Sequence, residues 1–284
     1  LPPIVWATTL MLTKSHLARR QLFKPRRLGL TATLTGLMLL VCCFLVYPGT
    51  PVMRHIFPVN VCSNLISAIK RTAATTDYKN TSASFSYRPI ATRESADREI
   101  YVFVIGETSR ADNWQLDGYS RPTNPRLSNE KNLIFYPKTL SESNTTHKSV
   151  PMLMSYLDAS NFGDSIYTAK SIFALFNDMG YRTAYFSNQS PNHSFIDFFG
   201  AQADTCAFIK SQSASKFDFD LLEPLSDFIS SNPDGRLFIV LHTYGSHFNY
   251  RERYPDSNSI FKPDNATDAD KNNRGELVNA YDNT

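Results

Sequence analysis

The hydrophobic positions of this chain fall into two regions of different kind. Residues 28–47 form an apolar run without a charge, whereas short apolar runs alternate with polar loops from residue 98 onward. Strand-like runs lie near 99–105, 132–136, 181–187 and 236–242, and runs with helical spacing lie near 149–157, 168–179 and 219–230. This alternation predicts an α/β domain over 98–284 with a mostly parallel central sheet, in which the first strand is buried.

The apolar run over 28–47 has the length of a membrane span. An α-helix of this length extends roughly 30 Å, the thickness of the hydrocarbon core of a bilayer. Basic residues crowd the segment 13–27, and no acidic residue precedes Asp77. By the positive-inside rule, 13–27 is a cytoplasmic loop and the chain after residue 47 emerges on the outer face. We therefore predict a transmembrane helix over 28–47, with residues 1–12 as the end of a preceding span.

Residues 48–97 are expected to join the membrane part to the outer domain. Within Asn60–Arg71 the apolar residues share one helical face, which predicts a helix lying on the membrane surface. These residues are Val61, Leu65, Ile66 and Ile69. The remainder is rich in Ser, Thr and Ala and favours a linker. Apolar segments on both sides of the basic loop argue against a nucleic-acid partner, and the formal net charge of +3 suggests none.

The ends of the sequence suggest an internal piece of a longer protein. The first residues lie within an apolar run without a starting Met, and the last ten, GELVNAYDNT, have a helical pattern with nothing to close it. Cys62 and Cys206 could pair outside the cytoplasm, but their spacing does not show whether they do.

Polar clusters follow the predicted strands. The strand over 99–105 ends at Gly106 and is followed by Glu107, Thr108, Ser109 and Arg110. The carboxyl ends of parallel strands are where α/β sheets form their sites, so a functional role and a plain polar turn are both open.

A second cluster, SESNTTHKSVPMLMS, has the pattern of a helix N-terminus. Thr145 or Thr146 would lie where free backbone N–H groups favour an anion, and a hydroxyl there could attack phosphorus. The alternative is an ordinary N-cap.

Two further clusters follow later strands. Asn188, Asn192 and His193 lie in FSNQSPNHS and are candidate phosphate or headgroup contacts. His242 ends the strand near 236–242, and His247 follows a Gly-Ser turn, so either could act as a ligand or an acid–base group. An ordinary polar loop is the alternative in both cases.

Together these motifs resemble those of the lipid A phosphoethanolamine transferases. The matching segments are GETSRADNWQLDGYSRPTNPRL, TTHKSVPMLMS, SNQS and HTYGSHFNYRERYP. That family includes the mobile colistin-resistance enzymes, which confer polymyxin resistance, and it belongs to the alkaline phosphatase-like and sulfatase-like superfamily. The resemblance implies an alkaline phosphatase-like sandwich, anchored in the bacterial inner membrane and facing the periplasm.

The resemblance also implies a zinc-dependent mechanism. Glu107 would bind zinc, and Thr146 would be both a zinc ligand and the nucleophile. Asn188 and His247 would contact phosphoethanolamine, whereas a lysine of the family is replaced by Asn192, with His193 beside it. Phosphatidylethanolamine would be the donor and lipopolysaccharide, at lipid A or its core sugars, the acceptor, in a monomeric enzyme with a covalent threonine intermediate.

The sequence departs from the family in two respects. The family's remaining zinc ligands are an Asp-His pair, and no such pair occurs here; Asp264, Asp268, Asp270 and Asp282 have no adjacent His. The cysteines that brace the nucleophile loop in the colistin-resistance enzymes are also missing. We therefore expect this chain alone to bind zinc weakly and not to turn over.

Three other functions remain open. A sulfatase would need a formylglycine signature, which the residues after Cys206 do not supply. A phosphoglycerol transferase would share the fold and the threonine nucleophile. A non-catalytic membrane homologue would not need both Glu107 and Thr146.

Overall fold

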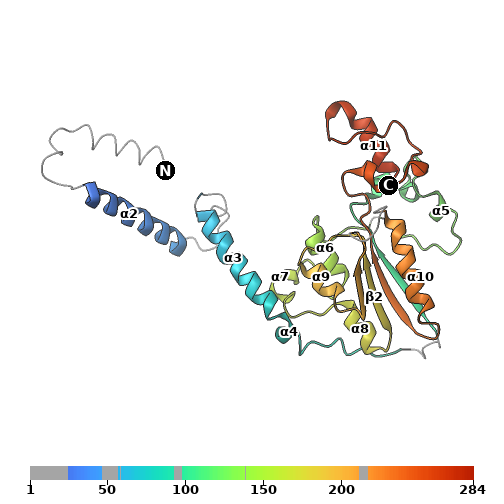
Figure 1. Ribbon diagram of the computed structural model, residues 1–284, viewed down its shortest axis with the longest axis horizontal. Helices are drawn as coiled ribbons and strands as arrows, with labels where there is room; N and C mark the ends of the chain where they lie inside the picture. The colour runs from blue at the N-terminus through green and yellow to red at the C-terminus, as the bar shows by residue number, and fades with distance from the viewer. Residues whose placement is uncertain (1–24, 47–56, 58, 93–97, 138, 211–216) are drawn as a thin grey trace. The chain divides into compact units, whose positions relative to one another are not determined.

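The computed structural model describes residues 25–46, 57, 59–92, 98–137, 139–210 and 217–284. These fall into two units, Leu1–Thr76 and Asp77–Thr284. The predicted spans and loops over 1–12 and 13–24 lie outside the described residues. The second unit contains the sheet and every candidate site residue (Figure 1).

The first unit contains two helices, α2 (Pro25–Val46) and α3 (Val59–Thr76). α2 confirms a helix over the apolar run. Among the residues that the structure describes, no helix combines the length and the apolar character needed to cross a membrane. The span over 28–47 therefore stays a prediction.

α3 confirms the helix expected over 60–71 and extends it by about one turn. The apolar side chains of its predicted face are all more than two-fifths exposed: Val61, Leu65, Ile66 and Ile69. Contact between this face and a membrane stays a prediction.

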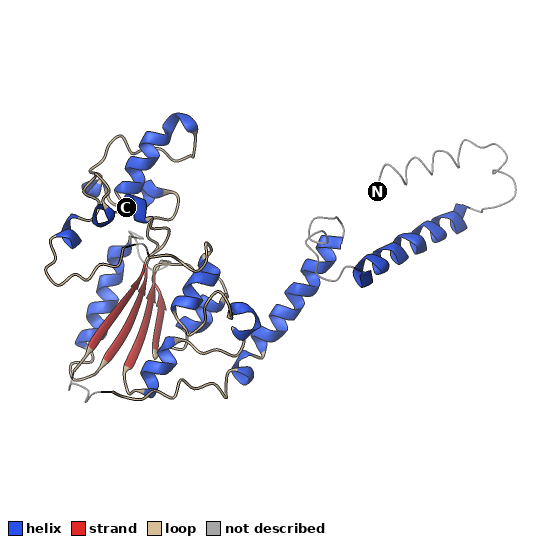
Figure 2. Cartoon of the chain, turned by 180° about the vertical axis from the view of Figure 1, so that it is seen from behind, coloured by secondary structure: helices blue, strands red, loops and turns tan. Residues whose placement is uncertain are grey.

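The second unit is built on a parallel sheet of four strands in the order β1-β4-β2-β3 (Figure 2). The strands are β1 (Ile100–Ile105), β2 (Arg182–Ser187), β3 (Thr205–Phe208) and β4 (Leu237–His242). The predicted α/β fold with a parallel sheet is confirmed. β4 is central and fully buried, because both of its neighbours pair with it and both faces of the sheet are covered there.

Helices cover the two faces of the sheet unequally. One face packs against α6 (Thr146–Leu153), α8 (Ile172–Asp178) and α9 (Phe195–Gly200), and the other packs against α10 (Leu222–Ser230). The shorter helices are α4 (Tyr78–Thr81), α5 (Pro125–Ser128) and α7 (Phe162–Ser165), and α11 (Arg274–Asp282) lies near the end of the chain. α11 confirms the helical pattern of the last residues.

Two predictions about the strands are wrong. Residues 132–136 form a loop, in which Ile134 and Tyr136 are about three-quarters exposed, because no described strand lies alongside to pair with them. β1 is not buried but is an edge strand. Tyr101 and Phe103 face the aromatic core, whereas α10 leaves the opposite face of β1 partly uncovered, with Val104 56% exposed.

The helix boundaries also differ from the predicted ones. α6 begins at Thr146 rather than near residue 149, because the amides of Lys148 and Ser149 both donate to the carbonyl of Thr145. The short elements β3 and α9 were not predicted, since four to six residues are too few to show a period.

Candidate functional site

Glu107 and Thr146 lie in direct contact. Glu107 follows β1, and Thr146 is the first residue of α6, with Thr145 as its N-cap. The Thr146 hydroxyl lies 3.0 Å and 3.2 Å from the two carboxylate oxygens of Glu107. Both residues are partly buried. Two predicted site residues that are 39 positions apart in the sequence are thus hydrogen-bonded to each other.

The loop after β4 supports the backbone of Glu107. The amide of Ser246 donates to the Glu107 carbonyl oxygen at 3.0 Å. Gly245 has a φ of +52°, and a Cβ at this position would lie 2.6 Å from the same oxygen. Only glycine therefore allows this close approach of the two loops. On the other side, Thr108 has a φ of +56°, and its hydroxyl donates to a Glu107 carboxylate oxygen at 2.8 Å.

Asp218 connects the loop after β2 with the loop after β4. Its carboxylate accepts hydrogen bonds from the side-chain amide of Asn188 and from the backbone amides of Tyr244 and Gly245, at 2.7–2.8 Å. Sequence analysis missed this role, because Asp218 lies between two phenylalanines and is 26 to 30 residues from its three donors in the sequence. The bonds fix the turn that holds Glu107.

The predicted substrate contacts Asn188 and His247 lie in these two connected loops. Asn188 is fully buried, and its amide nitrogen is engaged by Asp218. His247 is exposed, stacks on Tyr244 with ring centres 5.1 Å apart, and lies next to Ser246, which binds Glu107. Their roles as substrate contacts stay predictions, and His247 has the more accessible side chain.

Asn192 and His193 occupy an exposed loop before α9. Their backbone amides donate to the carboxylate of Asp197 at 2.7 Å and 2.6 Å, and His193 has a φ of +56°. Neither side chain is hydrogen-bonded to Glu107 or Thr146. Asp197 therefore fixes the backbone of this loop. The role of the two side chains in substrate binding stays a prediction.

His242 is fully buried at the carboxyl end of β4. Its Nδ1 atom lies 2.8 Å from the hydroxyl of Tyr185, while Nε2 has no hydrogen-bond partner among the described residues. Burial lowers the pKa of His242 to about 4, against the opposing effect of nearby carboxylates that include Glu107. The imidazole is therefore neutral at pH 7.

α11 binds the segment that follows Glu107. The hydroxyl of Tyr281 accepts from the amide of Arg110 at 2.7 Å and donates to the carbonyl of Thr108 at 2.9 Å. The fully buried carboxylate of Asp282 accepts from three side chains of the same segment: Asn113, Tyr119 and Arg121. Asp282 thus has a structural role, which agrees with its exclusion as a metal ligand.

Glu107 and Thr146 fit one part of a metal site. A carboxylate and a hydroxyl converge, but tetrahedral zinc takes four ligands. Within the described ranges, no group of three or more His, Cys, Asp or Glu side chains could hold a metal. Cys62 and Cys206 are both free. The donor set of the described residues is therefore incomplete for tight zinc binding.

The chain is similar in sequence to known phosphoethanolamine transferases. The chain is 28% identical to the Kdo(2)-lipid A phosphoethanolamine 7''-transferase of Salmonella typhimurium over 209 residues. The aligned region covers 72% of this chain and 37% of that protein. It is 31% identical over 192 residues to phosphoethanolamine transferase EptA of Escherichia coli K12, which covers 66% of this chain and 35% of that protein. The chain thus spans little more than a third of these relatives.

Solved structures show the same fold. The soluble domain of lipooligosaccharide phosphoethanolamine transferase A from Neisseria meningitidis is 26% identical, with a TM-score of 0.58 over 72% of this chain and 61% of that chain. The periplasmic domain of EcEptC, solved in complex with Zn, has a TM-score of 0.58 at 23% identity over 70% of this chain and 59% of that chain. The sequence model of the sulfatase family matches residues 99–284. The chain therefore belongs to the sulfatase family.

Proposed function

We propose that this chain is part of a membrane-anchored enzyme that transfers phosphoethanolamine from phosphatidylethanolamine to lipopolysaccharide, at lipid A or its core. The observation that carries the proposal is the contact between the Thr146 hydroxyl and the Glu107 carboxylate in a sulfatase-family fold. The relatives named as phosphoethanolamine transferases support this choice of transferred group.

Thr146 is the proposed nucleophile. Its oxygen would bond to the phosphorus of phosphatidylethanolamine while the bond to the diacylglycerol oxygen breaks, and diacylglycerol would leave with the proton. The threonine would then carry phosphoethanolamine until an acceptor hydroxyl or phosphate takes it. Glu107 orients the Thr146 hydroxyl, and the position of Thr146 in the first turn of α6 favours the negative charge of the phosphoryl group.

Zinc is the proposed cofactor, and Glu107 and Thr146 are the residues of this chain that would hold it. When bound, zinc would lower the pKa of the Thr146 hydroxyl and balance charge on the phosphoryl oxygens. Asn188 and His247 remain the proposed phosphoethanolamine contacts, with Asn192 and His193 at the exposed rim.

The proposed location is the bacterial inner membrane, with the sulfatase unit in the periplasm and the apolar run over 28–47 as the span. The exposed apolar face of α3, together with Lys70 and Arg71 in its carboxyl-terminal half, is suited to a membrane surface. We propose that the protein acts as a monomer.

Replacing Thr146 tests the proposed function. Thr146→Ala, expressed from the protein's own gene in a bacterial host, should abolish phosphoethanolamine addition to lipid A and core sugars, measured by mass spectrometry of the extracted lipids. Thr145→Ala is the matched control, because its side chain does not contact Glu107, and it should retain the modification. Unchanged modification in Thr146→Ala would contradict the mechanism.

The same measurement separates the alternatives. Mass spectrometry of the group trapped on Thr146 would reveal phosphoglycerol instead of phosphoethanolamine if the enzyme used that donor. The absence of any modified lipid with the unsubstituted full-length protein would favour a non-catalytic homologue.

A further inference from the structure

Tyr244 and His247 are the two ends of a four-residue turn after β4. The amide of His247 donates to the carbonyl of Tyr244 at 3.3 Å, and the amide of Tyr244 donates to the Asp218 carboxylate at 2.7 Å. Within this turn, Gly245 lies against the backbone of Glu107. The turn therefore places the side chain of His247 on the loop that supports Glu107.

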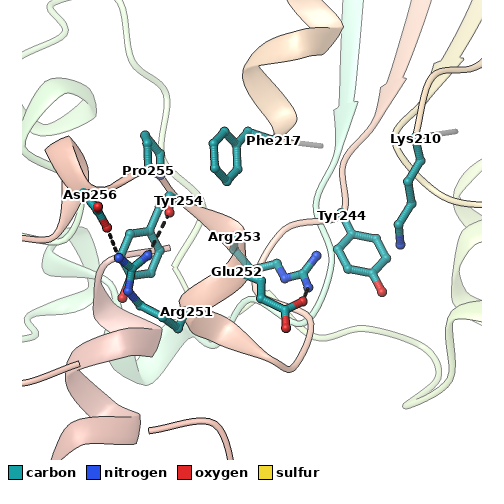
Figure 3. Close-up of a pocket in the computed structure, with 9 residues that line it drawn as sticks. All are labelled: Lys210, Phe217, Tyr244, Arg251, Glu252, Arg253, Tyr254, Pro255 and Asp256. Atoms are coloured by element: carbon teal, nitrogen blue, oxygen red, sulfur yellow. Dashed lines mark hydrogen bonds and ion pairs between the residues drawn. The ribbon is translucent and has the colours of Figure 1, made fainter. Parts of the chain in front are cut away.

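Cations hold the ring of Tyr244 from both sides. Figure 3 shows the ring between Arg253 and Lys210. The Lys210 ammonium lies 3.2 Å from the ring centre and the Arg253 guanidinium lies 4.2 Å from it, both within the range of cation–π contacts. Arg253 is itself fixed, because its side chain is only 10% exposed and its Nε atom donates to the carbonyl of Asn249 at 3.0 Å. The ring of Tyr244 is thus restrained in position and in tilt.

The imidazole of His247 stacks on this restrained ring. The two ring centres are 5.1 Å apart, and the ring planes differ by 29°. The Nδ1 atom of His247 lies 2.7 Å from the carbonyl oxygen of Phe248, and because this oxygen only accepts, Nδ1 carries the proton of the bond. Nε2 is then the nitrogen that the exposed imidazole offers, and in the neutral ring it is an acceptor. The stack and the bond together fix which nitrogen His247 presents.

We propose that Tyr244 is a positioning residue, whose ring, held between Lys210 and Arg253, orients the imidazole of His247 toward the substrate. A mobile imidazole would lose rotational freedom when it binds a ligand, whereas a stacked one is already ordered. That His247 contacts phosphoethanolamine rests on the proposed function. The orientation of its ring does not, so the two can be tested separately.

NMR spectroscopy of the full chain in detergent, labelled with nitrogen-15 histidine, tests the orientation without a substrate. The signals are assigned with His247→Gln and recorded at a pH at which the imidazole is neutral. In Tyr244→Leu the ring protons of His247 should shift downfield, because the ring current is lost, and the preference for a protonated Nδ1 should weaken. Tyr244→Phe keeps an aromatic ring and should retain the native signals. Tyr136→Leu is the control, at a tyrosine outside this loop that is 74% exposed, and should change nothing.

Two results of this measurement would overturn the proposal. One is a set of unchanged His247 signals in Tyr244→Leu, and the other is an equal change in Tyr244→Phe. Lys210→Met is a second variant, which keeps the ring and removes one of its two cations. It should shift the same signals in the same direction by a smaller amount, and the absence of a shift would contradict the role of the cations.

Transfer by the full-length protein tests the connection with the proposed function, with the modified lipids quantified by mass spectrometry. Tyr244→Leu should lower the initial rate about tenfold, because a small misplacement of a substrate contact slows a reaction strongly. In the His247→Gln background it should lower the residual rate by less than about twofold, because Tyr244 acts through His247. Equal losses in both backgrounds would contradict this coupling. No transfer by the unsubstituted protein would overturn the proposed function and leave the spectroscopic result standing.

Discussion

At the scale of single residues, the site depends on contacts that local sequence does not contain. The positions of Glu107 just after a strand and of Thr146 at the start of a helix could be predicted, because both lie in motifs that resemble a known family. Asp218 and Asp282 could not, since an acidic residue has the same local pattern whether it faces water or holds three distant donors. Their partners are set by the packing of loops 26 to 169 residues apart in the sequence.

Gly245 is predicted to be essential for the position of Glu107. In Gly245→Ala, the positive φ and the 2.6 Å approach to the Glu107 carbonyl would force the two loops apart. We expect a loss of about 1–3 kcal/mol in the free energy of unfolding, measured by urea titration, because the new residue is strained. Gly275→Ala is the control, since nothing lies within 4 Å of its added Cβ and it should be neutral or stabilising. Equal stability of the two variants would contradict this prediction.

His242 is predicted to make the fold sensitive to acid. Its pKa is about 4 in the folded chain and about 6.5 when unfolded, so the unfolded state binds a proton first as the pH falls. The stability from the neutral imidazole is complete above pH 6.5 and is lost as the pH falls from 6.5 to 4. This amounts to about 3 kcal/mol.

Urea unfolding at pH 7.5 and pH 4.0, followed by tryptophan fluorescence, measures this effect. The native chain should lose about 3 kcal/mol more than His242→Gln between the two pH values. An equal loss in both proteins would show that His242 does not titrate as the burial of its ring requires.

At the scale of elements, the sequence was most informative about strands with many β-branched or aromatic residues. β1, β2 and β4 were predicted within about one residue for this reason. β3 is only four residues long and is recognisable mainly from its pairing with β2. Residues 132–136 have the composition of a strand, but a strand also needs a neighbour with free backbone groups, which local sequence does not reveal.

The interaction of α11 with the segment after β1 is predicted to stabilise that segment specifically. Asp282→Ala would leave the partly buried donors of Asn113, Tyr119 and Arg121 without their acceptor, at a cost of about 1–3 kcal/mol. Hydrogen–deuterium exchange should increase over residues 110–121 and change little in β2 and β4. Asp256→Ala is the control, because its ion pair is exposed and should contribute less than about 1 kcal/mol. Unchanged exchange over 110–121 would contradict the role of Asp282.

At the scale of the whole molecule, the described residues combine a four-stranded parallel sheet with an incomplete metal site. Glu107 and Thr146 offer two oxygen donors, and the part of the chain that the structure describes contains no group of three or more His, Cys, Asp or Glu side chains that could hold a metal. The sequence led to the same expectation through the missing Asp-His pair.

We predict weak zinc binding by this chain. Zinc titration monitored by calorimetry should give a Kd in the micromolar range or weaker, since structural sites with four ligands bind far more tightly. Glu107→Ala should weaken the binding further, and Glu142→Ala, at an acidic residue not bound to Thr146, should not. Tight binding of one zinc per chain would contradict the prediction.

The bonds between Tyr281 and the loop after Glu107 also set a time order for folding. They join residues 171 and 173 positions apart in the sequence. A ribosome adding 5–20 residues per second would make Tyr281 on the order of ten seconds after Arg110. During that interval the sheet can begin to form, but the loop that carries Glu107 lacks the helix that holds it. The loop proposed to meet the metal therefore takes its final shape only after α11 has been made.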